Sequence, residues 1–469
     1  MSPLRTAVSL GLTTALLAAC ATAPEPTPVD TRAEALGHVQ IPSTWATPAN
    51  AAPVETGWLA SFNDPQLDAL VAEALAHNSD LAAAAARVEQ ADAQVDLAAA
   101  QLQPAIGVLG RGGTNSVSDL VSMFNGGMLR LSWEADLWGR LRYERNAAIA
   151  QRDASSADYR FARQSLAASV ARAWFVAAET AQQAQLADQM ATDAERLVEL
   201  TQDRLRVGIG TQTEVMTARA RLATYRDAAQ QIGMAHRSAL RALEILVGRY
   251  PAAAIAPRTE LSPFPPSIPA GMPLDALDRR PDMIAAQRRV AAAFNLVGEA
   301  KTSFWPSLSL SAGYGRISRE TIDTQESFER TTSSGSAATV IPLYTGGRRT
   351  GSVSLRNAEQ REAVADYARL ALKALGEVET ALDAENSLAA REELLSLAAQ
   401  DNRRVARLAQ ESYRIGKSDL REVMQGQLSA GAAEVALLAV RRERLTRRVD
   451  LHLALGGDFL VSPEQSQTP

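Results

Sequence analysis

Two stretches of the chain alternate between apolar and polar residues, the pattern of a β-strand whose faces meet different surroundings. In the first stretch the apolar set is Leu129, Leu131, Trp133, Ala135 and Leu137. In the second stretch it is Leu308, Leu310, Ala312 and Tyr314. Lipid on one side and water on the other produces this pattern, and so does the half-buried hairpin of a soluble protein. The pattern therefore predicts β-hairpins at 105–137 and 307–344, with polar tip loops at 115–126 and 319–332.

Before and after each predicted hairpin, apolar residues recur at the spacing of a helix. One helix is predicted over 65–103, and its counterpart begins at Pro281 and stops before Pro306, because proline suits a helix start or boundary. After each hairpin a proline-free helical pattern runs over 140–206 and 348–414, a length of roughly 100 Å. Both long helices carry a coiled-coil-like seam. The seam residues are Leu186, Met190, Leu197 and Leu200, and then Leu394, Ala398, Val405 and Leu408.

Each long helix ends in a turn that contains glycine. Gly208 and Gly416 are of the residue type that most often caps a helix C-terminus. Thr211 with Glu214, and Asp419 with Glu422, have the spacing of a capping box that begins a new helix. The sequence therefore predicts return helices over 211–247 and 419–455.

These elements occur twice because the chain is internally duplicated. Residues 80–104 match 282–306 at an offset of 202, and from about residue 139 the offset is 208. The matched pairs include Asp80 with Asp282, Pro104 with Pro306, Gly139 with Gly347, Arg206 with Arg414 and Gly248 with Gly456. Two equivalent repeats are therefore expected, at 61–248 and 281–456. A proline-rich linker, too irregular for a long helix, joins them at 249–280.

The N-terminal residues predict secretion. Arg5 precedes an apolar run that ends in Leu17-Ala-Ala-Cys20, which is typical of a signal peptide over 1–19. This ending resembles the lipoprotein box of bacteria, which implies that Cys20 becomes the acylated first residue of the mature protein; an incidental thiol is the alternative. Cys20 is the only cysteine, so no internal disulfide is expected. Residues 20–60 are then expected to form an extended, lipid-anchored segment, and 457–469 a C-terminal tail.

Composition narrows the class of protein. The chain is 46% hydrophobic but only 5% aromatic, which favours alanine-rich helices that pack closely. Its net charge of −5 gives no basic surface for nucleic acid. The rest of the chain does not predict a transmembrane helix, so strands would have to span any membrane. Four strands cannot close a barrel, and so two chains would supply eight strands or three chains twelve.

Catalytic and metal-binding patterns are missing from the sequence. The four histidines are scattered at His38, His77, His236 and His452, and no H-E-x-x-H, C-x-x-C or phosphate-loop pattern occurs. The sequence therefore predicts a mixed α and β membrane protein that is not an enzyme and needs no cofactor or metal.

The motifs and their order resemble the TolC-like outer-membrane efflux proteins, specifically the acylated subgroup. The motifs are Trp58-Leu-Ala-Ser-Phe-Asn-Asp-Pro, Arg279-Arg-Pro-Asp282 and the two Arg-x-Gly turns. The resemblance implies a homotrimer with a twelve-stranded β-barrel over an α-helical periplasmic barrel, in the outer membrane of a Gram-negative bacterium. It also implies the exit duct of a tripartite pump that passively conducts small molecules such as drugs and toxic compounds. The implied partners are a periplasmic adaptor and an inner-membrane transporter, often of the resistance-nodulation-division class.

The same resemblance implies roles for the two turns. In the family, the turn that meets the adaptor matches Val207, Gly208, Ile209, Gly210 and Thr211 in the first copy, and Ile415 and Gly416 in the second. In the family, acidic rings and polar links pinch the closed tube.

Only part of that gate is present in this chain. Glu422 matches one ring position, whereas Gln425 occupies the second. Glu214 and Tyr413 match the partners of an inter-protomer link. Ser418 replaces the basic member of that link, which leaves Lys417 or Arg421 as substitutes. For Glu214 and Glu422 the alternative role is the capping box.

Two other functions fit parts of the pattern. A type I protein-secretion channel shares the fold and differs by an ATP-driven partner. A non-conducting structural lipoprotein would use the long helices as a coiled-coil arm.

Overall fold

The computed structural model describes residues 22–50, 52–54, 56–117, 120–257, 260–321 and 326–460. The predicted signal peptide, Cys20 and the tail from residue 461 lie outside the described residues. The chain forms two compact units. The strand unit comprises residues up to Val39, Ala86–Ala157 and Ile284–Leu370, and the helical unit comprises Gln40–Ala85, Asp158–Met283 and residues from Ala371 onward. Each unit draws on both sequence repeats, so the repeats and the compact units are different divisions of the chain.

Equivalent helices of the two copies have equal lengths. They are α4 (Ser79–Ala100) and α8 (Pro281–Thr302) with 22 residues each, α5 (Arg140–Arg206) and α9 (Arg348–Arg414) with 67, and α6 (Gln212–Leu246) and α10 (Leu420–Ala454) with 35. The bounds of α5 and α9 coincide with those expected from the sequence. The duplication in the sequence is thus present in the fold.

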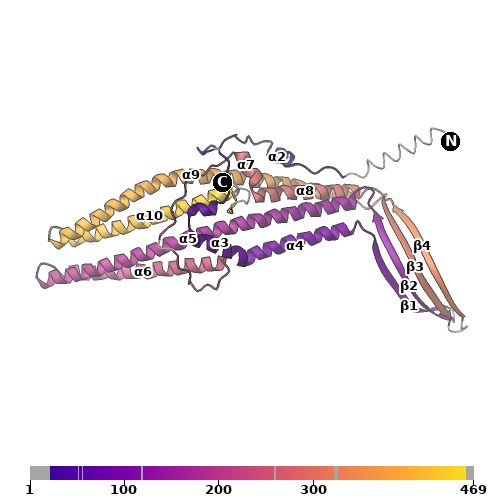
Figure 1. The fold of residues 1–469 in the computed structure, drawn as a ribbon, viewed down its shortest axis with the longest axis horizontal. Coiled ribbons are helices and arrows are strands. Elements are labelled where there is room, and N and C mark those ends of the chain that lie inside the picture. The colour runs from indigo at the N-terminus through magenta and orange to yellow at the C-terminus, as the bar shows by residue number, and fades with distance from the viewer. Residues whose placement is uncertain are drawn as a thin grey trace, which may run out of the picture. The chain divides into compact units, whose positions relative to one another are not determined.

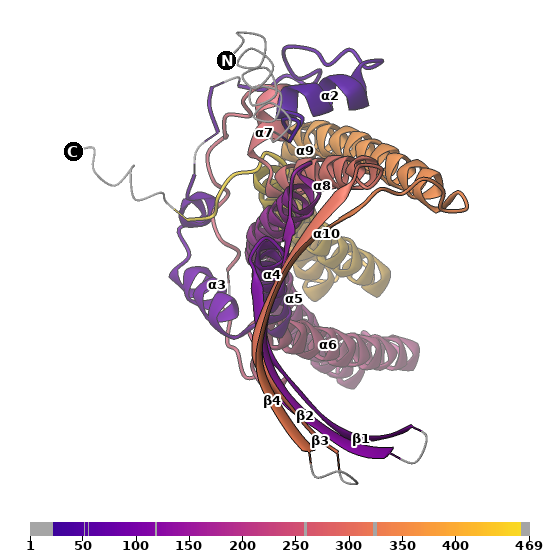
Figure 2. The same cartoon turned by 90° about the vertical axis from the view of Figure 1, so that its right-hand side faces the viewer.

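Four strands form one antiparallel sheet in the strand unit (Figure 1). They are β1 (Ala105–Val117), β2 (Leu120–Ala135), β3 (Ser307–Thr321) and β4 (Glu326–Val340), in the order β1-β2-β3-β4. Figure 2 shows the sheet close to its edge, with all four strands curving together. The prediction of long polar loops at 115–126 and 319–332 was wrong, because strands run through most of both ranges. Ladder hydrogen bonds join backbone groups, so polar side chains at these positions do not end the strands.

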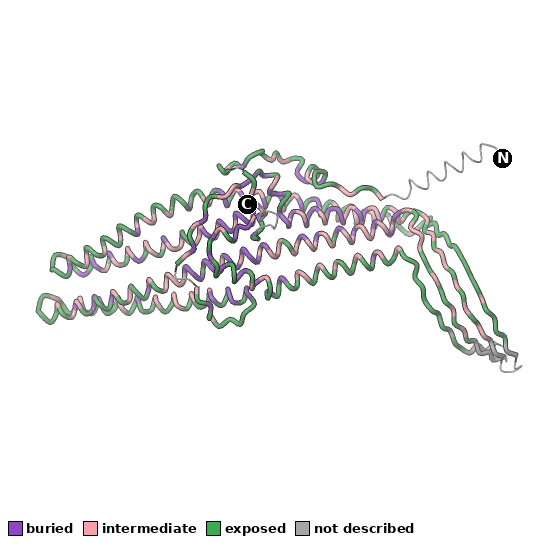
Figure 3. The backbone as a smooth tube through the Cα atoms, in the orientation of Figure 1, coloured by how far each residue is buried: buried purple, intermediate pink, exposed green. Residues whose placement is uncertain are grey.

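The register of the sheet places the two alternating patterns on one face. Leu129 lies opposite Tyr314, and Trp133 lies opposite Leu310. Strand β1 continues this face, because Val108 pairs with Leu129. Val108 is 80% exposed, and most of the sheet is exposed in the single chain (Figure 3). An exposed apolar face that extends over three strands indicates contact with lipid or with another protein.

The motif Trp58-Leu-Ala-Ser-Phe-Asn-Asp-Pro packs into the core of the helical unit. Trp58 and Phe62 form the 3-10 helix η1 (Trp58–Phe62), and both are buried. Asp64 caps α3 (Pro65–His77), and its carboxylate also accepts hydrogen bonds from Trp174 Nε1 at 2.9 Å and from Ser262. The motif is therefore a packing and capping element that connects the chain's N-terminal part to α5.

Two expectations about helices were wrong. The predicted helix 65–103 is broken at Asn78, which has extended backbone and caps α4 by accepting from the Leu81 N–H at 3.0 Å. Residues 20–60, expected to be extended, contain α2 (Pro28–Leu36), which begins with a capping box of Thr27 and Asp30, and the start of η1. The linker 249–280 was expected to be too irregular for a long helix, and it contains the seven-residue helix α7 (Pro273–Arg279).

The two copies use different residues for the same contact, which joins the residue before α4 or α8 to the end of α6 or α10. Asn78 donates to the carbonyl of Leu246 at 3.0 Å, and Arg280, at the equivalent position, donates to the carbonyl of Ala454 at 3.2 Å. Arg280 is 3% exposed and also binds Asp282 and Glu377, each at 2.8 Å. The Arg-Arg-Pro-Asp motif is thus a buried ion-pair cluster.

Among the described helices, α10 alone is long and apolar enough to cross a membrane, by length and composition only. However, Leu437 and Val440 of α10 are buried against Leu388 and Ala399 of α9. Packing within the helical unit therefore accounts for apolar residues of α10.

Candidate functional site

The two helical turns of the helical unit lie at the same end of it (Figure 1). In the turn between α5 and α6, the N–H of Ile209 bonds to the carbonyl of Arg204 at 3.0 Å, and Gly208 has φ +82°. In the turn between α9 and α10, the N–H of Lys417 bonds to the carbonyl of Ser412 at 2.8 Å, and Gly416 has φ +80°. Both turns are Schellman-type caps, for which glycine avoids a steric cost.

The predicted contact residues are at the surface of these turns. Val207, Ile209 and Ile415 are 70%, 65% and 59% exposed. A Cβ on Gly210 would lie 2.9 Å from the Leu205 backbone nitrogen, whereas one on Gly208 would meet open space. The two glycines thus differ: Gly210 allows a close backbone approach, and Gly208 supplies a left-handed conformation.

The capping boxes expected after the turns differ between the copies. Thr211 and Glu214 form a complete box, in which the Thr211 N–H donates to Glu214 at 2.7 Å and the Glu214 N–H donates to the Thr211 hydroxyl at 3.2 Å. Asp419 accepts from the Glu422 N–H at 3.0 Å, but the reciprocal bond does not form among the described residues. The second box is therefore half formed, and the exposed Glu422 carboxylate is not used for capping.

Tyr413 joins the two helical hairpins. It is fully buried, and its hydroxyl donates to Glu214 Oε1 at 3.4 Å within one chain. The link between protomers that the family resemblance implies for Tyr413 and Glu214 stays a prediction. Burial and the neighbouring Glu214 charge raise the pKa of Tyr413 above its ordinary value. Leu197, Leu420 and Val423 form a small apolar core around the Tyr413 ring.

Within one chain, the cation beside Tyr413 is Arg204. Its guanidinium carbon lies 4.4 Å from the centre of the Tyr413 ring, and Nη1 donates to the Tyr413 carbonyl at 2.9 Å. Arg204 was not among the predicted site residues, because the pair comes from different copies, 209 positions apart. The remaining predicted gate residue, Gln425, is exposed, and its amide donates to Ser429 at 3.3 Å.

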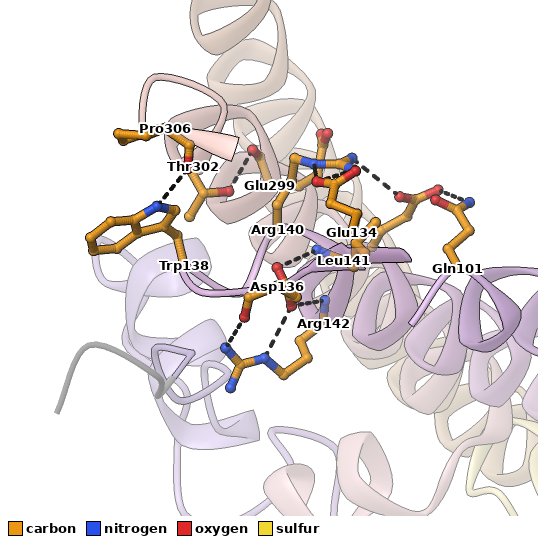
Figure 4. A network of polar contacts seen from close by, with 11 residues as sticks. Gln101, Glu134, Asp136, Trp138, Arg140, Leu141, Arg142, Glu299, Thr302 and Pro306 are labelled. Atoms are coloured by element: carbon orange, nitrogen blue, oxygen red, sulfur yellow. Dashed lines mark hydrogen bonds and ion pairs between the residues drawn. The ribbon is translucent and has the colours of Figure 1, made fainter. Parts of the chain in front are cut away.

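A second polar network lies in the strand unit where β2 leads into α5 (Figure 4). Arg140 binds Glu134 of the strand at 3.0 Å and Glu144 of the next helical turn at 3.7 Å. Asp136 accepts from the N–H groups of Leu141 and Arg142, which caps α5. These contacts fix the first turn of α5 to the end of the sheet.

Two aromatic rings cover the base of the sheet. Trp138 stacks on Trp305 with ring centres 5.0 Å apart, and Trp138 Nε1 donates to the Pro306 carbonyl at 2.8 Å. In Figure 4, Trp138 lies beside Pro306, away from the carboxylates of the network. Tryptophan with one polar contact and an apolar body is typical of the interface between a membrane and water.

No group of three or more histidine, cysteine, aspartate or glutamate side chains is placed to hold a metal ion within the described parts of the chain.

The fold and the paired helical turns are those of an outer-membrane channel. The chain belongs to the outer membrane efflux protein family, whose profile matches residues 70–249 and 272–457. This membership confirms the resemblance inferred from the motifs. The family is one of channels and not of enzymes.

Individual relatives match over most of their length. The pyoverdine export outer membrane protein OpmQ of Pseudomonas putida is 30% identical over 439 residues, which are 89% of this chain and 92% of the relative. The probable efflux pump outer membrane protein TtgC of the same species is 29% identical over 439 residues, 89% of this chain and 88% of the relative. The solved outer-membrane channel OprN superposes with a TM-score of 0.81 at 25% identity, over 90% of this chain and 98% of OprN.

Proposed function

We propose that this protein is the outer-membrane exit duct of a tripartite efflux pump and acts as a homotrimer. The observation that carries the proposal is an exposed apolar face on a four-stranded sheet that is continuous in sequence with helices of 67 residues. Such helices are too long and too polar to lie in a bilayer. The strands would span the outer membrane, and the helices would extend into the periplasm.

The open edges of the sheet support the trimer. Strands β1 and β4 each pair with one neighbour only, so each has an edge of unpaired backbone groups. Lipid does not tolerate such edges, and closure therefore requires strands from other copies. Three copies would supply the twelve strands of a closed barrel.

Exposed apolar positions on α9 support the same assembly. In the first copy Leu197 of the predicted seam is buried, whereas Leu394, Val405 and Leu408 of the second copy are more than half exposed in the single chain. Burial of these side chains against a neighbouring copy would close the helices into a periplasmic tube. Both features would be satisfied by one oligomer.

The two turns are the proposed adaptor contacts and gate. Val207, Ile209 and Ile415 offer apolar contact to a periplasmic adaptor, with Gly208, Gly210, Thr211 and Gly416 shaping the turns. Tyr413 and Glu214 would hold the closed state within each protomer. Glu422, which is free of capping, would form one acidic ring with Gln425 beyond it, and a ring of carboxylates favours cations.

The remaining parts of the proposal are the anchor and the transported molecules. Acylated Cys20 would fasten the chain to the outer membrane. The inner-membrane transporter would be of the resistance-nodulation-division class that the family resemblance implies. The names of the relatives, a pyoverdine exporter and a probable efflux pump component, support small molecules as cargo. They do not favour the protein-secretion alternative.

Cross-linking from one turn tests the proposal. Acylation would block Cys20, so Thr211→Cys supplies a single reactive thiol for a short cross-linker in living cells. Capture of an adaptor of a proton-driven pump is expected. Capture of an adaptor of an ATP-driven protein exporter would replace efflux by secretion, and capture of no periplasmic protein would overturn the duct.

A further inference from the structure

A cavity of about 420 Å³ lies in the helical unit, away from the helical turns. Helix α5 contributes Arg160, Arg163 and Gln164 to its lining. Arg279, at the end of α7, adds a third guanidinium group to the lining, and Phe459, after α10, adds an aromatic ring. The described residues that also line it are Val54, Thr56, Pro281, Gly456, Gly457 and Asp458. Its volume is within the range of pockets that hold small ligands.

The described lining of the cavity carries more positive than negative charge. Arg160, Arg163 and Arg279 have no carboxylate partner among the described residues, and Asp458 is the only carboxylate in the described lining. Arginines at positions 160 and 163 share one face of α5, because residues three apart on a helix are neighbours. Arg160 and Arg279 are exposed and Arg163 is half-buried, so all three guanidinium groups are accessible to a ligand from solvent. Three unpaired guanidinium groups around one cavity favour an anionic ligand.

A buried polar atom gives a second requirement. Gln164 is 9% exposed, and its Oε1 has no hydrogen-bond partner among the residues that the structure describes. Leaving a buried acceptor without a donor costs about 1–3 kcal/mol, so such atoms usually have a partner. An anionic group that binds the arginines would leave Gln164 Oε1 unpaired. The ligand therefore also needs a hydroxyl or amide group that donates to this atom.

An apolar wall gives the third requirement. Phe459 is buried, and the guanidinium carbon of Arg163 lies 5.8 Å from the centre of its ring. The backbone is close-packed here, since a Cβ on Gly456 would lie 3.1 Å from the Arg280 nitrogen. Val54 and Pro281 add further apolar surface. A ligand with one flat, weakly polar face would fit this wall.

We propose that this cavity binds an acidic sugar, in which a carboxylate or phosphate meets the three arginines and a hydroxyl or amide donates to Gln164. The same chemistry is present in the carboxylated sugars of a cell wall and in soluble sugar phosphates. The cavity includes none of the residues proposed above as adaptor contacts or gate. Binding of cell-wall glycan would attach the channel to the cell wall, and binding of a sugar phosphate would make the channel responsive to that solute.

Isothermal titration of the assembled full-length protein in lipid nanodiscs tests the proposal. The probes are N-acetylmuramic acid, N-acetylglucosamine 1-phosphate, neutral N-acetylglucosamine and inorganic phosphate. We expect one or both acidic sugars to bind, and the neutral sugar and inorganic phosphate to bind at least tenfold more weakly. Arg160→Gln and Arg279→Gln should each weaken binding about tenfold. Arg219→Gln, an equal change of charge at an exposed position outside the cavity, should leave it unchanged.

The probes also separate the source of the ligand. Binding of the muramic acid alone assigns the site to cell-wall glycan, binding of the phosphate alone assigns it to sugar phosphates, and Gln164→Leu should weaken either about tenfold. Absence of binding by both acidic sugars would overturn the proposal. Equal binding of inorganic phosphate, or equal losses in Arg160→Gln and Arg219→Gln, would also overturn it. Bilayer conductance of the same variants, measured in parallel, distinguishes a failure of this site from a failure of the duct.

Discussion

Replacement of Arg204 by alanine should open the channel. Arg204 stacks on the Tyr413 ring at 4.4 Å and donates to the Tyr413 carbonyl at 2.9 Å, and both contacts join the two helical hairpins. If these two contacts exist only in the closed state, their loss raises the free energy of the closed state by their whole contribution. Arg204→Ala is therefore a direct test of whether the contacts between the hairpins hold the gate.

The structure sets the size of the effect. A partly buried cation–π contact contributes about 1 kcal/mol, and a hydrogen bond from a charged donor contributes about 1.5 kcal/mol. Allowing for solvent at this half-buried site, we take about 2 kcal/mol, which is roughly a thirtyfold shift towards the open state. Tyr413→Phe removes only the long 3.4 Å hydrogen bond to Glu214 and should shift the equilibrium about twofold.

Single-channel recording in planar bilayers measures the open fraction. The matched control is Arg206→Ala, because Arg206 is exposed and, within the described parts of the chain, pairs only with Asp203 on its own helix at 2.8 Å. The control should conduct like the unaltered protein, since exposed ion pairs contribute little. An Arg204→Ala channel with unchanged open fraction would refute the reasoning. So would a larger effect of Tyr413→Phe than of Arg204→Ala.

Four further variants test other parts of the structure. Gly208→Val forces a β-branched residue into φ +82° at an open surface position, so drug efflux should be lost while native electrophoresis still shows the trimer; normal efflux would contradict the adaptor contact. Glu422→Gln should lower the cation selectivity of the channel measured from reversal potentials, and an unchanged selectivity would leave Glu422 a role in the turn only. Arg280→Met leaves two carboxylates without their buried partner, so the free energy of unfolding measured in urea should fall by about 3–5 kcal/mol, and a fall below 1 kcal/mol would contradict the ion-pair cluster. Burial and the nearby Arg448 charge lower the pKa of His452 to about 3, so the unfolded chain takes up its proton first as the pH falls from about 6.5. Stability should then decrease between about pH 6.5 and 3, by at most about 1.4 kcal/mol per pH unit, and His452→Phe should remove this part of the pH dependence in denaturant titrations.

Elements with local signals were predictable from the sequence. The bounds of α5 and α9 follow from the absence of proline and from the glycine caps at Gly208 and Gly416. The apolar face of the sheet follows from the period of two, and the duplication added a second, independent instance of each element. The complete capping box at Thr211 was likewise visible, because it depends only on residues three positions apart.

Features that depend on distant residues were not predictable. The helix break at Asn78 is completed by a hydrogen bond to Leu246, 168 positions away. Periodicity runs through Asn78 without a sign of the break, since asparagine also occurs within helices. The Arg204–Tyr413 contact is a similar case, because no local pattern identifies which of many exposed arginines stacks on a ring in the other copy.

The two turns of one chain have diverged in their chemistry. The first presents Val207 and Ile209 with Gly208 between them, whereas the second presents Ile415 beside Lys417 and Ser418. A partner that caps both turns therefore meets one apolar and one charged surface in each protomer. Identical copies of such a partner would bind in two unequal environments, so mutation of one turn would remove one class of binding site and leave the other occupied.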